Sequence, residues 1–203
     1  MSHITFCVTG KTFSSPFFQA WTRLISNLSK TDVRFDVLNV PNENPYLEKN
    51  VCIDRIRETS SDIVVWIDSS CVFDLSHFNT LFNDIVDGGK DVVAGMRRRL
   101  DGSYLVTKPE SKYNDYITGE EVEDFIRLHP QSLMAVDFTE LAFCVMNANI
   151  FKKVDSPWCL PQSVGDSPFD VLSPDFSFCS KIRLAGYIVC VNPSVRVSSF
   201  IGM

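Results

Sequence analysis

The spacings that build metal centres and covalent frameworks are missing from this 203-residue sequence. None of its three histidines has a partner at metal-ligand spacing; they are His3, His77 and His129. The seven cysteines are an odd number and include no Cys-x-x-Cys pair, which argues against a zinc site or a disulfide framework. Several cysteines lie inside apolar runs, so we expect buried free thiols in a reducing compartment.

Long apolar stretches and basic character are also missing. No apolar run approaches the length that crosses a bilayer, and the first residues lack the basic and apolar regions of a signal peptide. We therefore expect a cytoplasmic protein without a membrane span. The formal net charge of −6 argues against a protein whose main task is gripping a nucleic-acid backbone, but leaves room for a local basic pocket that binds a small anion.

Glycine is too sparse around the first predicted strand for the two common phosphate-binding loops. Gly10 is followed by Lys11 and Thr12, but a P-loop needs an earlier glycine where Thr5 stands. A dinucleotide-binding fingerprint needs further glycines beyond Gly10, and they are absent. We expect Lys11 and Thr12 on a surface turn, with a place at the mouth of a ligand site as the alternative.

Apolar and amphipathic segments alternate along the chain. In the first half, the pattern predicts strands over residues 4–8, 33–40, 63–67 and 91–96, separated by helices over 16–28, 46–59 and 75–86. The second half predicts strands over 134–138, 142–146 and 187–191, helices over 119–128, 147–154 and 175–185, and a loop over 157–174. Uniformly apolar strands alternating with helices predict an α/β fold whose mostly parallel central sheet is flanked by helices on both faces.

An acid ends the most apolar of these strands. In the stretch DIVVWIDSSCVF, five apolar residues lead to Asp68, and two serines follow it. Ligands of α/β folds bind outside the carboxyl ends of the strands, so Asp68 is placed to face a ligand while its strand stays buried. The alternative is that Asp68 only caps a turn.

Four segments, taken in order, resemble the GT-A fold glycosyltransferases, especially the family-2-like nucleotide-sugar transferases. SDIVVWIDSSCVF resembles the strand that carries their Asp-x-Asp signature, and KDVVAGMRRR resembles the strand after it. VDFTELAFCVMNANIFKKVDSPW resembles their acceptor-side segment, and SPDFSFCSKIRLAGYIVCVNPSVRVSSF resembles the acid, helix and strand that follow. The resemblance implies a Rossmann-like GT-A sandwich in one domain, residues 1–203, with a nucleotide-sugar-binding half over 1–96 and an acceptor-side half over 97–203.

The sequence departs from the family's pattern at three places. Ser70 stands where the second acid of the Asp-x-Asp signature belongs, and Pro174 stands where a glutamate should precede Asp175. The histidine that often follows the last strand and joins the metal is missing, and Ser199 or Phe200 occupies that region. The presumed catalytic carboxylate is therefore present, while two of the usual metal contacts are not.

The resemblance assigns the chemistry of the transfer to a few polar residues. Asp175 would be the base that accepts the proton of the acceptor hydroxyl, although a helix that starts there favours an acid in any case. Mn²⁺ or Mg²⁺ would join the donor phosphates to Asp68, with Ser70 as a weak ligand. Arg97 and Arg98, with the neighbouring Arg99, would place positive charge near the diphosphate, unless they form a solvated turn.

Recognition of the sugar and of the nucleobase would fall to other residues. Glu140 would bind sugar hydroxyls; its alternative is a carboxylate at a strand edge. Thr9, Asp36 and Asn39, near the carboxyl ends of the first two strands, would hold the base. Trp66 and Phe73 are expected in the core.

We therefore expect a glycosyltransferase that transfers a sugar from a nucleoside diphosphate sugar to an acceptor hydroxyl with inversion. Its partners would be the donor, an acceptor that the sequence does not name, and a possible second copy in a homo-oligomer. The missing metal contacts motivate an alternative, a degenerate relative that binds a nucleotide or glycan without turnover. A nucleotidyltransferase with a similar sheet is a third hypothesis, because fold alone does not decide function.

Overall fold

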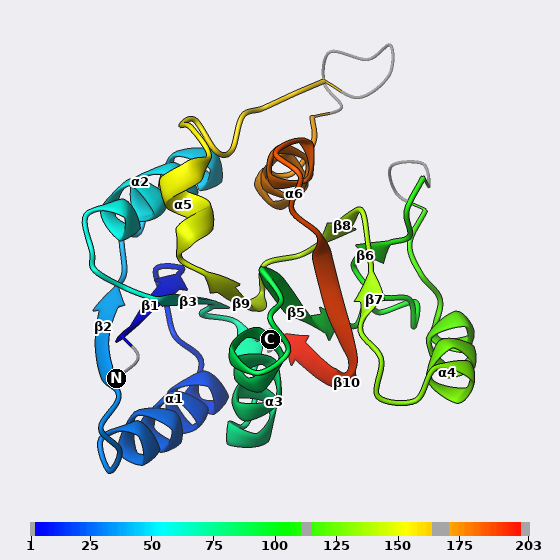
Figure 1. Ribbon diagram of the computed structural model, residues 1–203, viewed down its shortest axis with the longest axis horizontal. Helices are drawn as coiled ribbons and strands as arrows, with labels where there is room; N and C mark the ends of the chain where they lie inside the picture. The colour runs from blue at the N-terminus through cyan, green and yellow to red at the C-terminus, as the bar shows by residue number, and fades with distance from the viewer. Residues whose placement is uncertain (1–2, 111–114, 164–170, 200–203) are drawn as a thin grey trace.

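The computed structural model describes residues 3–110, 115–163 and 171–199. The first half of the chain alternates strands and helices as the sequence predicts (Figure 1). Its elements are β1 (His3–Thr9), α1 (Ser15–Leu28), β2 (Arg34–Leu38), α2 (Pro45–Arg57), β3 (Ile63–Asp68), β4 (Cys71–Val72), α3 (Leu75–Val86) and β5 (Val92–Arg97).

The second half contains shorter elements. They are β6 (Val106–Thr107), α4 (Gly119–Leu128), β7 (Met134–Ala135), β8 (Phe138–Thr139), β9 (Phe143–Asn147), α5 (Asn149–Lys153), α6 (Pro174–Leu184) and β10 (Val189–Ser199). The predicted loop over 157–174 is irregular at 157–163, and its residues 164–170 lie outside the described ranges. No helix in the described ranges has both the length and the apolar character to cross a membrane.

The central sheet has the strand order β2-β1-β3-β9-β5-β10-β4, and β7 pairs with β10 beside this path. β1 runs parallel to both β2 and β3, and β5 runs parallel to β10. β9 lies antiparallel between β3 and β5, so the five longer helix-connected strands share one direction. The expected α/β sandwich with a mostly parallel central sheet is confirmed.

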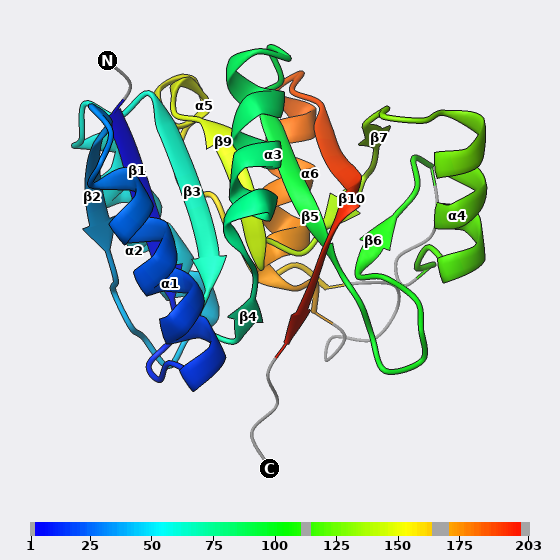
Figure 2. The ribbon, with the colours of Figure 1, turned by 90° about the horizontal axis from the view of Figure 1, so that it is seen from below.

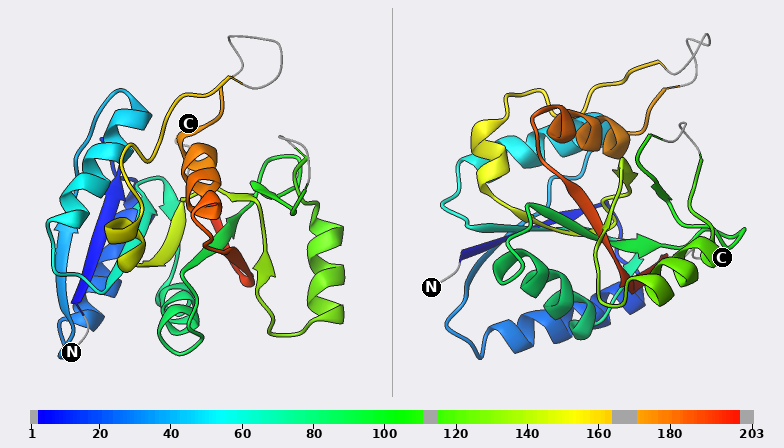
Figure 3. Two further views of the ribbon diagram at one scale, coloured as in Figure 1. Left: turned by 45° about the horizontal axis from the view of Figure 1, so that its top comes forward. Right: turned by 45° about the vertical axis from the view of Figure 1, so that its right-hand side comes forward.

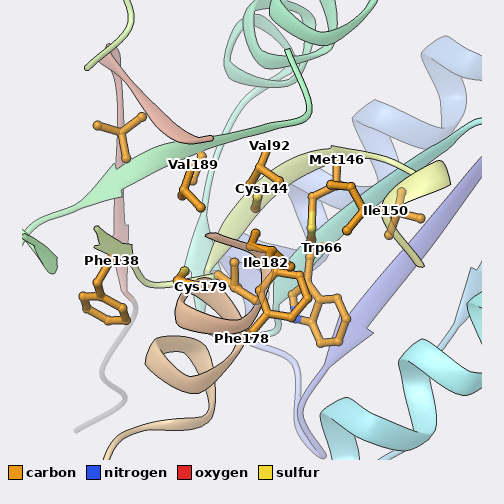
Figure 4. Packing of buried hydrophobic residues seen from close by; sticks show 14 of the residues in the cluster. Trp66, Val92, Phe138, Cys144, Met146, Ile150, Phe178, Cys179, Ile182 and Val189 are labelled. Atoms are coloured by element: carbon orange, nitrogen blue, oxygen red, sulfur yellow. The ribbon is translucent and has the colours of Figure 1, made fainter. Parts of the chain in front are cut away.

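Helices cover both faces of this sheet. Figure 2 shows α1 and α3 in front of the strands, with α2, α5 and α6 behind them. Each strand divides its side chains between the two faces, as β3 shows: Val64 and Trp66 join the core under α2 and α6, whereas Val65 and Ile67 join the core under α1 and α3. In Figure 4, Trp66 and Cys144 point from the sheet toward Phe178 of α6.

Capping residues explain where several helices begin. The sequence offers Asp74 and Ser76 as caps for the helix predicted over 75–86. The Asp74 side chain accepts a hydrogen bond from the His77 backbone N–H and begins α3. Thr118, with Glu121 three residues later, has the spacing of a capping box, and the two residues form this box at the start of α4. Figure 3 shows α4 standing beside the main sheet, at the edge near β7 and β10.

The structure corrects four predictions of the sequence. The helical spacing of apolar residues predicts Phe18 on the buried face of α1 and Leu47 on that of α2, but Phe18 is 64% exposed and Leu47 is 49% exposed. The predicted strand over 134–138 is two short strands, because β7 pairs with β10 while β8 pairs with β6. The last strand does not end at residue 191 but continues through an irregularity between Asn192 and Arg196 to Ser199.

All seven cysteines are buried and free, as the sequence predicts. Burial raises the pKa of the thiols of Cys159 and Cys179 to about 12. Only the Cys52 thiol has a lowered pKa, because the Cys7 thiol beside it hydrogen-bonds to it while burial acts in the opposite direction. Buried thiols with raised pKa values react slowly, because the thiolate is the nucleophile.

We therefore expect none of the seven thiols to react within minutes when the native protein meets a water-soluble disulfide reagent at about pH 8. All seven should react after denaturation in guanidinium chloride. The colour released by the reagent counts the thiols in both states. Rapid reaction of several thiols in the folded protein would contradict the buried arrangement.

Candidate functional site

The strand order reverses at β1, and the loops that leave β1 and β3 touch each other there. The Ser69 backbone N–H donates to the Thr9 carbonyl over 2.8 Å. Gly10 has a φ of 117°, and a Cβ at this residue would overlap the Ser69 side chain, so the close approach requires glycine. In doubly wound sheets, this reversal is where ligands bind.

Three consecutive residues at the start of α2 each hold a different part of this region. The buried Glu48 carboxylate accepts from the Gly10 backbone N–H over 3.1 Å. The Lys49 ammonium forms an ion pair with Asp175, the acid in the first turn of α6. The Asn50 side chain accepts from the Trp158 backbone N–H over 2.7 Å and donates to the Cys159 carbonyl. Residues 48–50, in the N-terminal part of α2, therefore join the β1 loop, α6 and the segment after α5.

The Lys49–Asp175 pair is nearly buried, with 11% and 12% of the two side chains exposed. The Lys49 nitrogen also lies 5.4 Å from the centroid of the Trp66 ring, within range of a cation–π contact. Burial opposes the charged form of Lys49, but the Asp175 carboxylate outweighs it and raises the pKa of Lys49. Ser173 caps α6 by accepting from the Phe176 backbone N–H, which places Asp175 at the helix start.

Glu140 lies between the end of β3 and α6. The Asp68 backbone N–H donates to the Ala142 carbonyl over 2.9 Å, and the Cys179 thiol of α6 donates to the Thr139 carbonyl, so both sides of the Glu140 segment are fixed. Glu140 Oε2 is 3.1 Å from Arg97 Nε, yet this buried oxygen accepts no aligned hydrogen bond from the described residues.

The electrostatic surroundings of Glu140 tie the predicted acids together. Burial raises the pKa of Glu140 to about 7, against the opposing effect of Arg97. The nearby carboxylates of Asp175 and Asp68 raise this pKa further. Acids that are far apart in the sequence therefore lie within one electrostatic neighbourhood, at the carboxyl ends of the strands.

Asp68 begins a tight turn. Its Oδ1 atom accepts from both the backbone N–H and the hydroxyl of Ser70, each over 2.7 Å. The antiparallel pairing of β4 with β10 then sets Cys71 opposite Ser199. The alternative role predicted for Asp68, capping a turn, is therefore filled by its Oδ1 atom. This role is compatible with a place for Asp68 in the site.

The donor atoms here do not fit a carboxylate-rich Mn²⁺ or Mg²⁺ site. Within the described residues, no three His, Cys, Asp or Glu side chains are placed to share an ion. Asp68 supplies one carboxylate, and the Ser70 hydroxyl donates to it. The carboxylates of Glu140 and Asp175 already face Arg97 and Lys49.

One cavity adjoins the group of acids through Arg97, and a second lies at the end of β1. The first, of about 650 Å³, is lined by the arginines that follow β5 and by the serines that end β10: Arg97, Arg98, Arg99, Ser198 and Ser199, with Leu100, Asp101, Leu105 and Tyr116. The other, of about 200 Å³, is apolar and lies between α1 and the ends of β1 and β2. Phe13, Phe18 and Val37 line it, and Asn39 lies at its edge.

The structure brings most of the predicted site residues together. Asp68, Ser70, Arg97, Glu140 and Asp175 form the central group, and Arg98 lines the adjoining cavity. Thr9 is buried where β1 ends. The Asn39 side chain donates to the Val8 and Gly10 carbonyls, so it supports the β1 loop.

Asp36 does not join this group. It is paired in register with Thr5 rather than with the end of β1, and its carboxylate lies 2.8 Å from the His3 ring nitrogen.

Two residues of this region, Glu48 and Lys49, were not among the site residues predicted from the sequence. A usable signal exists, because the first turn of a helix that follows a parallel strand lies at the carboxyl edge of the sheet.

Comparison with known proteins identifies the fold. No protein-family model matches the sequence, and no curated protein matches it significantly. Among solved structures, A197 from STIV aligns over 100% of this chain and 87% of its own, with 16% identity and a TM-score of 0.61. GalNAc-T7 with UDP, GalNAc and Mn²⁺ aligns over 100% of this chain and 44% of its own, with 10% identity and a TM-score of 0.57.

A mutant Drosophila beta-1,4-galactosyltransferase 7, in complex with manganese, UDP-Gal and xylobiose, aligns over 100% of this chain and 72% of its own. Its identity is 13% and its TM-score is 0.53. The chain has the GT-A fold. At these identities the likeness concerns the fold, and activity has to be argued from the site itself.

Breaking the buried ion pair from one side should destabilise the protein strongly. We expect Lys49→Met to cost about 3–5 kcal/mol, because Asp175 is then buried without a counter-charge. The double variant Lys49→Met/Asp175→Asn should lose less than the sum of the two single variants, with a coupling of about 1 kcal/mol or more. Urea unfolding gives the free energy of unfolding of the wild type, the two single variants and the double variant. Lys11→Met, which breaks an exposed pair with Glu43, is the control and should cost less than about 1 kcal/mol.

Glu140 should make stability fall as the pH rises. The unfolded chain releases this proton near the ordinary pKa of 4.5, whereas the folded protein keeps it up to about 7, so ionisation penalises the folded state between those values. Relative to the wild type, Glu140→Gln should gain about 1–3 kcal/mol between pH 5 and pH 8. Urea unfolding at both pH values tests this, with exposed Glu123→Gln as the control. A stability difference that does not change with pH would refute it.

Proposed function

We propose that this chain is a glycosyltransferase that moves a sugar from a nucleoside diphosphate sugar to an acceptor hydroxyl with inversion. The observation that carries the proposal is the gathering of Asp68, Glu140 and Asp175 at the carboxyl edge of a GT-A fold. The fold neighbours GalNAc-T7 and beta-1,4-galactosyltransferase 7 support it, because their structures contain UDP or UDP-Gal together with manganese.

In the proposed reaction, Asp175 accepts the proton of the acceptor hydroxyl while that oxygen attacks the anomeric carbon. The sugar–phosphate bond breaks on the opposite face, and the nucleoside diphosphate leaves. Lys49 positions the Asp175 carboxylate through their nearly buried ion pair, and the Lys49 ammonium itself lies over the Trp66 ring. A well-placed base of this kind contributes about 10²–10⁴-fold in rate.

The other predicted residues take the roles that their positions support. Glu140 is close enough to Asp175 and Asp68 to bind sugar hydroxyls between them. Thr9 and Asn39 shape the end of β1 where the nucleoside would lie, and Asp36 is left out because it faces His3. We propose residues 1–96 as the donor-binding half and residues 97–203 as the acceptor side.

One observation favours a second candidate, a relative that binds a nucleotide or glycan without turnover. The Asp175 carboxylate forms a nearly buried ion pair with Lys49, and Glu140 faces Arg97, so both carboxylates are already occupied by cations of the chain itself. This candidate predicts donor binding with no product. Release of pyrophosphate instead of a nucleoside diphosphate would identify a nucleotidyltransferase.

A panel of UDP- and GDP-sugars tests the proposal, with thermal shift as the measure of binding and chromatography as the measure of product. We expect at least one donor to raise the melting temperature and to release its nucleoside diphosphate. Asp175→Asn should lower kcat by about 10²–10⁴ while donor affinity changes little.

Asp137→Asn is the matched control. Asp137 also forms an ion pair with a residue of α6, Arg183, but lies outside the group of acids. This variant should retain the wild-type kcat. No shift and no nucleoside diphosphate from any donor would count against the enzyme, and binding without product would favour the non-catalytic candidate.

A further inference from the structure

We propose that the cavity lined by Arg97, Arg98 and Arg99 binds the diphosphate of the donor through protein cations, without a divalent metal. This inference rests on the proposed function and specifies how its leaving group is held. The cavity volume of about 650 Å³ lies within the range of small-molecule sites.

The arginines of the cavity carry more positive charge than nearby carboxylates neutralise. Arg97 faces Glu140, and Arg99 lies 3.7 Å from Asp101 and over the Tyr116 ring at 4.5 Å. Arg98 is exposed, and within the described ranges no carboxylate lies within ion-pair distance of it. Guanidinium groups match phosphate oxygens with paired, charge-assisted hydrogen bonds, so this surplus suits a diphosphate.

An unpaired hydroxyl provides an independent observation. Ser199 Oγ is buried in the cavity wall and has no hydrogen-bond partner among the described residues. A buried hydroxyl without a partner is unfavourable, and a phosphate oxygen would satisfy it. Ser199 is the residue opposite Cys71 in the β4–β10 pairing, so the cavity adjoins the turn that begins at Asp68.

The same residues explain why a metal is not required. Ser70 stands where the resembled pattern has an acid, and Ser199 or Phe200 stands where it has a histidine; a hydroxyl is a weak ligand for a divalent ion. The hydroxyl of Ser199 is nevertheless a good donor to a phosphate, and the arginines supply the positive charge that the ion would bring. The loss of metal ligands and the gain of anion donors thus occur at one place.

Isothermal titration of the full chain with UDP and with inorganic pyrophosphate tests the proposal, once in EDTA and once in Mn²⁺. We expect each ligand's Kd in EDTA to agree with its value in Mn²⁺ within about threefold. Arg98→Ala should weaken both ligands about tenfold or more, Arg98→Lys should recover part of the loss, and Ser199→Ala should weaken both by a smaller factor.

Arg127→Ala is the control, because this exposed arginine pairs with Asp124 on α4, outside the cavity. Its Kd values should equal those of the wild type. The inference would be overturned, even if a donor sugar is turned over, by binding that appears only with Mn²⁺ or by Kd values that Arg98→Ala leaves unchanged. Metal-free, Arg98-dependent binding of both ligands supports the inference, and if no donor is then turned over, the proposed transfer fails while the anion site stands.

Discussion

The buried ion pair between Lys49 and Asp175 is the constraint on which the site depends. The two residues lie 126 positions apart in the sequence, and each would be a costly isolated charge in its surroundings. Removing either side chain would leave the other as an unpaired buried charge, so the pair fixes how α2 and α6 meet on one face of the sheet. Its contribution is best understood as specificity of arrangement, because a buried pair gains little net stability over apolar residues of the same size.

That constraint extends through the N-terminal part of α2, residues 48–50. Glu48 holds the loop at Gly10, and Asn50 holds the backbone at Trp158 and Cys159. A movement of α2 would therefore displace the end of β1, the acid of α6 and the segment after α5 together. The polar residues in this part of the helix explain why α2 buries Glu48 while Leu47 faces solvent.

Local signals in the sequence predicted the elements well where the cause is itself local. The helices over 75–86 and 119–128 were predicted to the residue, because the side chains of Asp74 and Thr118 mark their starts. The length of β10 was missed, because its ladder continues past an irregularity that only the neighbouring strands reveal. The site residues differ in the same way. Asp68 could be predicted, because an acid that ends an apolar strand is a local signal, whereas Lys49 could not, because its role depends on a partner far along the chain.

Charges are largely paired at the centre of the site and are less completely paired at the adjoining cavity. Glu140 and Asp175 are each matched by one cation, Arg97 and Lys49, so the centre of the site is close to balanced in charge. Arg98 adds positive charge at the adjoining cavity without a carboxylate partner in the described part of the chain. An acidic protein with a net charge of −6 thus concentrates unbalanced positive charge where a ligand could reach it. A polyanion would meet attraction in that cavity and little repulsion from the paired acids, which is the electrostatic pattern that a diphosphate leaving group needs.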